Sequence, residues 1–206
     1  QNPTTEDYRL GVKVLELGQA YLIQSNVVQR ATPVLKRLCD QIGETTSFAV
    51  LQNGQVQYPI SFEPKKPVRV AGRVAASFAA KQSSVGRLLT AQLADSTLEE
   101  ILATNTPQDA AIRSQLNELR KNGRTIDKGA TEAEVISVAQ IVKGAGNTVV
   151  GAIEVLAPQF RVNITDIEDS LAKAAEDLSK ALGGARTSLT QALEKEISRP
   201  QVASAG

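Results

Sequence analysis

Glu154 is the residue whose type and neighbours most clearly point to chemistry. It stands between Ile153 and Val155 in an apolar run with the composition of a buried strand. A buried carboxylate needs a partner or must take up a proton, because its charge is costly away from water. We therefore expect Glu154 to pair with a basic side chain, or to accept hydrogen bonds from a hydroxylated or cationic ligand. The candidate basic partners are Arg69, Arg73 and Lys81. The alternative is that the opposite face of the strand is buried and Glu154 is solvated.

A second candidate site is the stretch that contains Ser83, Ser84, Val85 and Gly86. Backbone N–H groups at the start of a helix, together with the helix dipole, favour an anion such as a carboxylate. The stretch could therefore bind an anion. The alternative is that the two serines only cap or interrupt the helix.

The composition excludes several kinds of chemistry. The chain has no histidine, so the commonest general base and the commonest metal ligand are both missing. Cys39 is the only cysteine, which rules out an internal disulfide and argues against a zinc site and a cofactor or metal centre. We expect Cys39 to be a buried structural thiol. We also expect no enzyme activity, since an enzyme would need an acid/base pair of carboxylates, for instance Asp127 with Glu154.

The charge balance argues against direct contact with nucleic acid or an anionic membrane. The chain has 23 basic and 22 acidic residues, for a net charge of +1. No apolar run approaches the roughly 18 residues of a membrane span, and the N-terminus lacks the pattern of a signal peptide. We therefore expect a cytoplasmic protein. Because position 1 is not methionine, we expect the chain to begin inside a longer gene product.

Two apolar, β-branched runs around a glycine-rich turn must position Glu154. The runs are residues 135–142 and 148–157, and the turn is Lys143-Gly144-Ala145-Gly146-Asn147. The pattern predicts an antiparallel hairpin, because Gly and Asn tolerate the positive φ angles that such loops require. Both runs are too apolar for a wet edge, so we expect them in the middle of a sheet.

The remaining segments predict an α+β fold. Residues 46–51 and 55–60 flank Asn53-Gly54, which is a strong hairpin signal. Residues 68–74 are predicted as a strand and 77–93 as a helix. Helical periodicity also occurs at residues 10–22, 28–42, 96–102, 109–121 and 163–182. Helices and hairpins in this order favour a mostly antiparallel sheet flanked by helices over a doubly wound parallel fold.

Several short motifs follow one another along the chain. They are Tyr8-Arg9-Leu10-Gly11, Leu15-Glu16-Leu17-Gly18, Ala31-Thr32-Pro33-Val34-Leu35, Gly43-Glu44-Thr45, Ala49-Val50-Leu51, 83–91, 121–127, the central hairpin and Ala157-Pro158. In these motifs and their order the chain resembles the effector-binding domain of the IclR family of bacterial transcription regulators. The resemblance implies a GAF-like domain with an antiparallel sheet, flanking helices and a small-molecule pocket. It also implies an N-terminal winged helix-turn-helix domain that binds operator DNA and is absent from this chain.

The resemblance also implies a domain division and an assembly. Residues 1–25 would be the connecting helix from the DNA-binding domain, 26–183 the effector-binding domain, and 184–206 a C-terminal extension. Family members form homodimers or homotetramers, in which a metabolite effector alters how the DNA-binding domains are presented.

The family pattern implies eight ligand-binding residues. Backbone amides of the first helix turn, a pocket acid before the central hairpin, and the inward faces of both hairpin strands would contact the effector. The positions are Ser83, Ser84, Val85, Asp127, Ser137, Ala139, Glu154 and Leu156. For Asp127 the alternative is a loop aspartate that binds nearby backbone N–H groups. The chain departs from the pattern at Ser137, Gln140, Glu154 and Leu156.

The sequence thus predicts the ligand-sensing and oligomerisation domain of an IclR-type regulator. An effector that prefers one arrangement of the oligomer would shift its population and so change operator affinity. The alternative is a GAF-type sensor module of a signalling protein that is not a transcription factor.

Overall fold

Six antiparallel strands form one sheet with the spatial order β3-β2-β1-β6-β5-β4. Their bounds are Thr45–Gln52 (β1), Gln55–Phe62 (β2), Ser77–Ala79 (β3), Arg124–Lys128 (β4), Val135–Lys143 (β5) and Val149–Pro158 (β6). The computed structural model describes residues 26–74, 76–102 and 106–183. The predicted helix at residues 10–22, the connecting segment 1–25 and the extension 184–206 lie outside the described residues.

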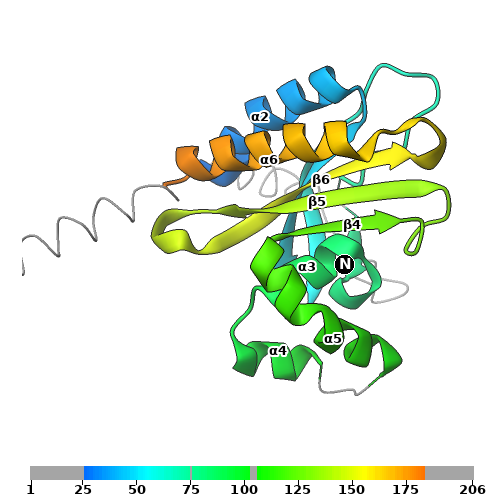
Figure 1. The fold of residues 1–206 in the computed structure, drawn as a ribbon. Coiled ribbons are helices and arrows are strands. Elements are labelled where there is room, and N and C mark those ends of the chain that lie inside the picture. The colour runs from blue at the N-terminus through cyan, green and yellow to red at the C-terminus, as the bar shows by residue number, and fades with distance from the viewer. Residues whose placement is uncertain (1–25, 75, 103–105, 184–206) are drawn as a thin grey trace, which may run out of the picture.

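Helices cover both faces of the sheet (Figure 1). The α-helices are Asn26–Ile42 (α2), Ser84–Ala91 (α3), Asp95–Ile101 (α4), Pro107–Asn122 (α5) and Ile164–Ala181 (α6). Short 3-10 turns are Ala80–Gln82 (η1), Ala145–Asn147 (η2) and Gln159–Arg161 (η3). Figure 1 shows α2 and α6 side by side on one face, with α3, α4 and α5 on the opposite side. The predicted α+β fold with an antiparallel sheet flanked by helices is confirmed.

The central hairpin is formed by β5 and β6, and it lies inside the sheet, as predicted. Its turn has positive φ angles at Gly146 (69°) and Asn147 (61°). The first hairpin turns at Asn53 (φ 50°) and Gly54 (φ 72°), the conformation that Asn-Gly favours. Turn chemistry therefore fixes the register of both strand pairs.

The two faces of the sheet support two separate hydrophobic clusters. Alternate residues of β6, including Ile153 and Val155, face α2 and α6, where Leu35 and Leu171 complete the packing. The opposite face packs against α3, around Val85, Leu88, Ala139 and Ala152. Cys39 of α2 is buried, as expected.

Two local predictions were wrong. Residues 68–74 are not a strand but part of an irregular loop, in which Glu63 accepts hydrogen bonds from the Gly72 amide (2.8 Å) and from Arg69. Residues 77–93 are not one helix, because Ser77–Ala79 adds an edge strand to β2. Phe78 of this strand packs edge-on against Tyr58, with ring centroids 6.2 Å apart. This tertiary contact overrides the helical periodicity of the segment.

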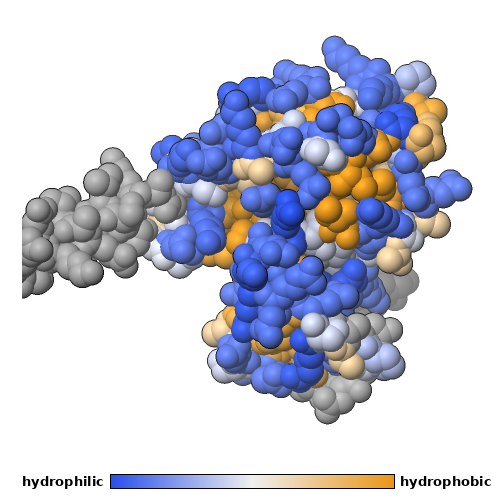
Figure 2. All heavy atoms as spheres, viewed as in Figure 1, coloured by the Kyte–Doolittle hydropathy of each residue, from blue (hydrophilic) through white to orange (hydrophobic). Residues whose placement is uncertain are grey.

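The surface on the side of β4 is mixed. Figure 2 shows mainly hydrophilic residues on the helices, while hydrophobic residues gather over the strands between α6 and the α3–α5 side. Ile126 on the edge strand β4 belongs to the exposed large hydrophobic residues. None of the helices that the structure describes has the length and apolar character that crossing a bilayer requires.

Candidate functional site

Polar residues from four segments enclose a small cavity on the α3 face of the sheet. Its volume is about 10 Å³, roughly the room that one water molecule occupies. The lining residues are Arg73, Ser83, Ser84, Asp127, Thr131, Glu132, Val135, Ser137, Glu154 and Leu156. Six of the eight sequence-predicted residues are therefore brought together here.

Strand register explains why the hairpin residues meet. Ser137 of β5 lies opposite Leu156 of β6, and Ala139 lies opposite Glu154. Directly opposed residues of antiparallel strands project to the same face, so all four side chains share the α3 side of the sheet. Glu154 is only 1% exposed, which excludes the solvated alternative.

A chain of hydroxyl groups connects the start of α3 to this carboxylate. The Ser137 hydroxyl donates a hydrogen bond to Glu154 Oε1 (2.7 Å). Ser84, the first residue of α3, lies 3.0 Å from Ser137 between the two Oγ atoms. Since Ser137 has only one hydroxyl proton and gives it to Glu154, Ser84 must donate to Ser137. The other carboxylate oxygen, Glu154 Oε2, is buried and has no hydrogen-bond partner among the described residues.

Arg73 closes the cavity and is the basic partner of Glu154. Its Nη1 lies 3.9 Å from Glu154 Oε2, which is an ion pair without a hydrogen bond. The same guanidinium donates to Glu132 Oε2 (2.6 Å) and, at 3.4 Å, to the Tyr58 hydroxyl. It also lies over the Tyr58 and Phe78 rings, with Cζ 5.9 and 5.4 Å from their centroids. Of the three partners expected from the sequence, Arg73 is the one found.

Burial and charge shift the pKa values of this group. Burial raises the pKa of Glu154, although Arg73 and the Ser137 hydrogen bond oppose the shift. Burial and the neighbouring Glu154 charge raise the pKa of Tyr58. Burial lowers the pKa of Arg73, but the Glu154 charge and Tyr58 outweigh this and the net shift is upward. The cavity therefore holds a carboxylate whose charge is incompletely compensated.

We expect the variant Glu154→Gln to gain stability relative to the parent as pH rises. Because the folded-state pKa of Glu154 is above its ordinary value of 4.5, the folded parent binds this proton more tightly than the unfolded chain. The parent therefore loses stability as pH rises from 4.5 to the folded-state pKa, by about 1.4 kcal/mol for each pH unit in that interval. Urea unfolding of both proteins at a series of pH values measures the difference. If the free energies of unfolding of the two proteins change with pH in parallel, the expectation is wrong. Glu99→Gln is the control, because hydrogen bonding to Arg113 lowers the pKa of that exposed carboxyl.

The other predicted residues have structural contacts as well. Ser83 is the N-cap of α3, and its hydroxyl accepts from the Gly86 amide (3.0 Å). Asp127 accepts from the amides of Ala130 (2.7 Å) and Thr131 (3.3 Å), and Arg87 lies 3.6 Å from it. Both alternatives noted from the sequence, the cap and the loop aspartate, are therefore observed.

Two predicted residues do not line the cavity, and several lining residues were not predicted. Val85 and Ala139 pack into the apolar cluster behind it. Thr131, Glu132 and Val135 line the cavity but were missed. They belong to the loop before β5 and to the start of β5. This loop meets Arg73 only in the folded chain, because the two segments are about 60 residues apart in the sequence.

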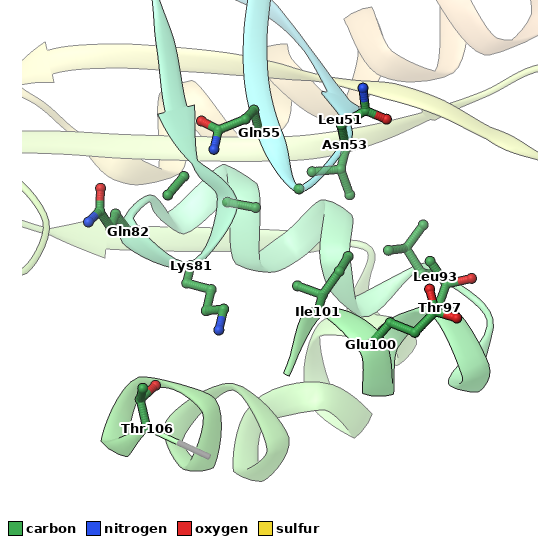
Figure 3. A pocket seen from close by; sticks show the side chains of 13 residues that line it. Leu51, Asn53, Gln55, Lys81, Gln82, Leu93, Thr97, Glu100, Ile101 and Thr106 are labelled. Atoms are coloured by element: carbon green, nitrogen blue, oxygen red, sulfur yellow. The ribbon is translucent and has the colours of Figure 1, made fainter. Parts of the chain in front are cut away.

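A larger groove lies on the same side of the sheet, between the first hairpin and α4. Its volume is about 890 Å³, and none of the eight predicted residues lines it. In Figure 3, Lys81 of η1 and Thr106, the residue that caps α5, extend toward the same space. The Lys81 ammonium is paired with the buried Asp109 carboxylate (2.7 Å). We prefer the smaller cavity as the candidate site, because it contains a buried carboxylate oxygen that has no hydrogen-bond partner among the described residues.

Metal binding finds no support in the part of the chain that the structure describes, where no group of three or more His, Cys, Asp or Glu residues could hold an ion. The candidate site is lined by serine hydroxyls, carboxylates and the Arg73 guanidinium, and the guanidinium of Arg87 pairs with Asp127 beside it. Such a set binds small polar molecules through hydrogen bonds and charge.

Comparisons with known proteins agree on one family. The family model "Bacterial transcriptional regulator IclR C-terminal" matches residues 19–183. The chain is 28% identical to the HTH-type transcriptional regulator XynR of Escherichia coli K12, over 89% of this chain and 77% of that protein. A regulator structure from Rhodococcus sp. RHA1 superimposes with a TM-score of 0.76 at 25% identity, over 84% of this chain and 76% of the other. An IclR homologue from Microbacterium hydrocarbonoxydans, solved in complex with 4-hydroxybenzoate, has the same fold. Its TM-score is 0.71 at 23% identity, and the match covers 84% of this chain and 75% of that one.

Proposed function

This chain belongs to the IclR family of bacterial transcriptional regulators, and we propose that residues 26–183 are its effector-sensing domain. The small cavity on the α3 face would be the sensing site. The observation that carries the proposal is the Ser84–Ser137–Glu154 chain, which leaves a buried oxygen facing that cavity. Structural packing alone does not require such a group, because an apolar residue at position 154 would avoid its desolvation cost.

Membership of the family supports a regulatory role for this site. XynR is an HTH-type transcriptional regulator, and the homologue from M. hydrocarbonoxydans was solved in complex with 4-hydroxybenzoate. We propose that a metabolite effector binds at the cavity and shifts the population of two arrangements of a homodimer or homotetramer. Operator DNA would be bound by a winged helix-turn-helix domain N-terminal to this chain, with residues 1–25 as the connection and 184–206 as an extension.

We propose sensing without catalysis. An acid/base pair of Asp127 and Glu154 would need both carboxylates to be available to a substrate. Asp127 instead accepts from two backbone amides and from Thr131 Oγ1 in its own turn. Its arrangement is that of a loop-stabilising aspartate.

A thermal-shift screen of the full chain tests the sensor. Small carboxylates, aromatic acids, sugars, amines and guanidinium compounds would be compared as separate classes. A ligand at about 100 times its Kd stabilises the folded state by roughly 2.7 kcal/mol, which gives a shift of several degrees for a domain of this size. We expect one class to stabilise the parent.

The control variants locate the binding. Ser137→Ala should weaken the effect, because it removes a hydroxyl within the cavity, whereas Thr97→Ala changes only the larger groove. A stabilisation that survives in Ser137→Ala and disappears in Thr97→Ala would place the ligand in the groove and refute the assignment of the site. A folded parent that no class stabilises would refute the sensing function.

A further inference from the structure

The buried carboxylate of Glu154 already supplies the negative charge that the start of α3 favours. Glu154 Oε1 is joined through Ser137 to Ser84, the first residue of this helix. An anion at a helix N-terminus interacts favourably with the helix dipole. A second carboxylate from a ligand would stand beside Glu154 in a site removed from water, where like charges repel strongly. The chain thus places its own carboxylate two hydrogen bonds from the first residue of α3.

The outer position of the cavity is filled by a cation, the guanidinium of Arg73. Arg73 belongs to the loop between β2 and β3, and its side chain remains 15% exposed. Its short hydrogen bond goes to Glu132, whose side chain is 53% exposed. Toward the buried Glu154 Oε2 it comes no closer than 3.9 Å. The buried oxygen of Glu154 therefore faces a cation that makes its short hydrogen bond to another carboxylate, that of Glu132.

The remaining charges decide what could replace Arg73. Arg87 lies 3.6 Å from Asp127, so this basic residue and this acidic residue balance one another. If the Arg73 side chain moves outward, Glu154 remains at the inner end of the cavity and Glu132 at its rim. Both are carboxylates, and the position that the Arg73 guanidinium now occupies also lies near the Tyr58 and Phe78 rings. Carboxylates with adjacent aromatic faces favour a cationic ligand.

We propose that this site binds a cationic effector, a guanidinium or primary amine compound, that displaces Arg73 and takes its place against Glu154. The inference rests on the proposed sensing function and specifies its ligand class. Arg73 acts as an internal competitor. The apparent Kd of the effector therefore equals its intrinsic Kd divided by the fraction of molecules in which Arg73 has moved out.

Chemical rescue of Arg73→Ala tests the proposal. Removing the internal competitor should create a site for methylguanidinium, and calorimetry or thermal shift on the full chain would detect binding at least tenfold tighter than to the parent. The double variant Arg73→Ala/Glu154→Gln should lose this binding. Arg69→Ala is the matched control, because Arg69 lies in the same loop and pairs with Glu63 at the surface. Sodium chloride at equal ionic strength controls for salt.

The outcomes separate the ligand class from the sensing function. Tighter methylguanidinium binding that depends on Glu154 supports the proposal. If benzoate or another carboxylate stabilises Arg73→Ala while methylguanidinium does not, the cationic class is wrong and the sensor stands. If neither methylguanidinium nor a carboxylate binds any folded variant, the cationic class is wrong, and the sensing function fails only if the remaining classes of the screen also leave the parent unstabilised. Arg73→Gln keeps the side-chain stem over the aromatic rings and serves if Arg73→Ala does not fold.

Discussion

Replacing Gly86 with alanine is expected to destabilise the domain by about 3 kcal/mol or more, at the upper end of overpacking costs. A β-carbon at position 86 would lie 2.7 Å from the Ala80 Cα atom and closer still to the Ala80 carbonyl oxygen. It would also lie 2.7 Å from Ser83 Oγ, the atom that caps α3. Because two of these contacts are with backbone, the start of α3 would have to move. Urea unfolding measures the loss.

Gly54→Ala provides the control for the glycine substitution itself. Gly54 has a φ of 72°, so alanine is strained there by about 1–2 kcal/mol, but its β-carbon would meet no atom within 4 Å. If Gly86→Ala loses no more free energy of unfolding than Gly54→Ala, the close packing of α3 against η1 is not the reason that position 86 requires glycine. A larger loss shows that Gly86 is required by sterics rather than by ligand contact.

Replacing Arg161 with alanine is expected to lower the free energy of unfolding by roughly 2–3 kcal/mol. Arg161 donates two hydrogen bonds to the Glu44 carboxylate (2.9 and 2.8 Å) and a third to the Val68 carbonyl (2.8 Å). The Glu44 side chain is only 6% exposed, and breaking a buried pair costs about 3–5 kcal/mol because a charge is left uncompensated. We reduce this figure because Arg161 is partly exposed and because Lys66 still pairs with Glu44 (3.1 Å). Urea unfolding at neutral pH checks it.

A second arginine tests whether burial causes the effect. Arg113 also makes two hydrogen bonds to a carboxylate, that of Glu99, but both side chains are well exposed. Exposed pairs are screened by water, so Arg113→Ala should be indistinguishable from the parent. Equal losses for the two arginine variants would mean that burial of Glu44 is not the reason. The double variant Glu44→Gln/Arg161→Ala should recover part of the loss, because no buried charge is then left unpaired.

Local sequence signals predicted the hairpins and helix ends. Asn53-Gly54 carries the backbone preference of its turn within two residues, and Asn163 caps α6 by accepting from the Thr165 amide. Ser137 and Ala139, which the sequence placed on the inward face of the hairpin, do share a face, since period two is a property of any strand.

The sequence could not predict contacts between distant segments. The edge strand Ser77–Ala79 is stabilised by pairing with β2, which the helical periodicity of its own residues does not encode. Arg73 was one of three possible partners of Glu154, and only the loop arrangement distinguishes it. Glu132 gave no signal at all, because a charged residue in a polar loop is ordinary until its partner is known.

Strand β6 contributes side chains to both faces of the sheet. Glu154 faces the cavity, while its neighbours Ile153 and Val155 are packed under α2 and α6. Since such packing has almost no spare volume, a sideways or twisting displacement of β6 must be passed on to these helices. The helix α2, Asn26–Ile42, is the first helix of the part of the chain that the structure describes. A displacement of β6 at Glu154 would therefore act on α2, the first of the described helices, by direct packing rather than through a loop.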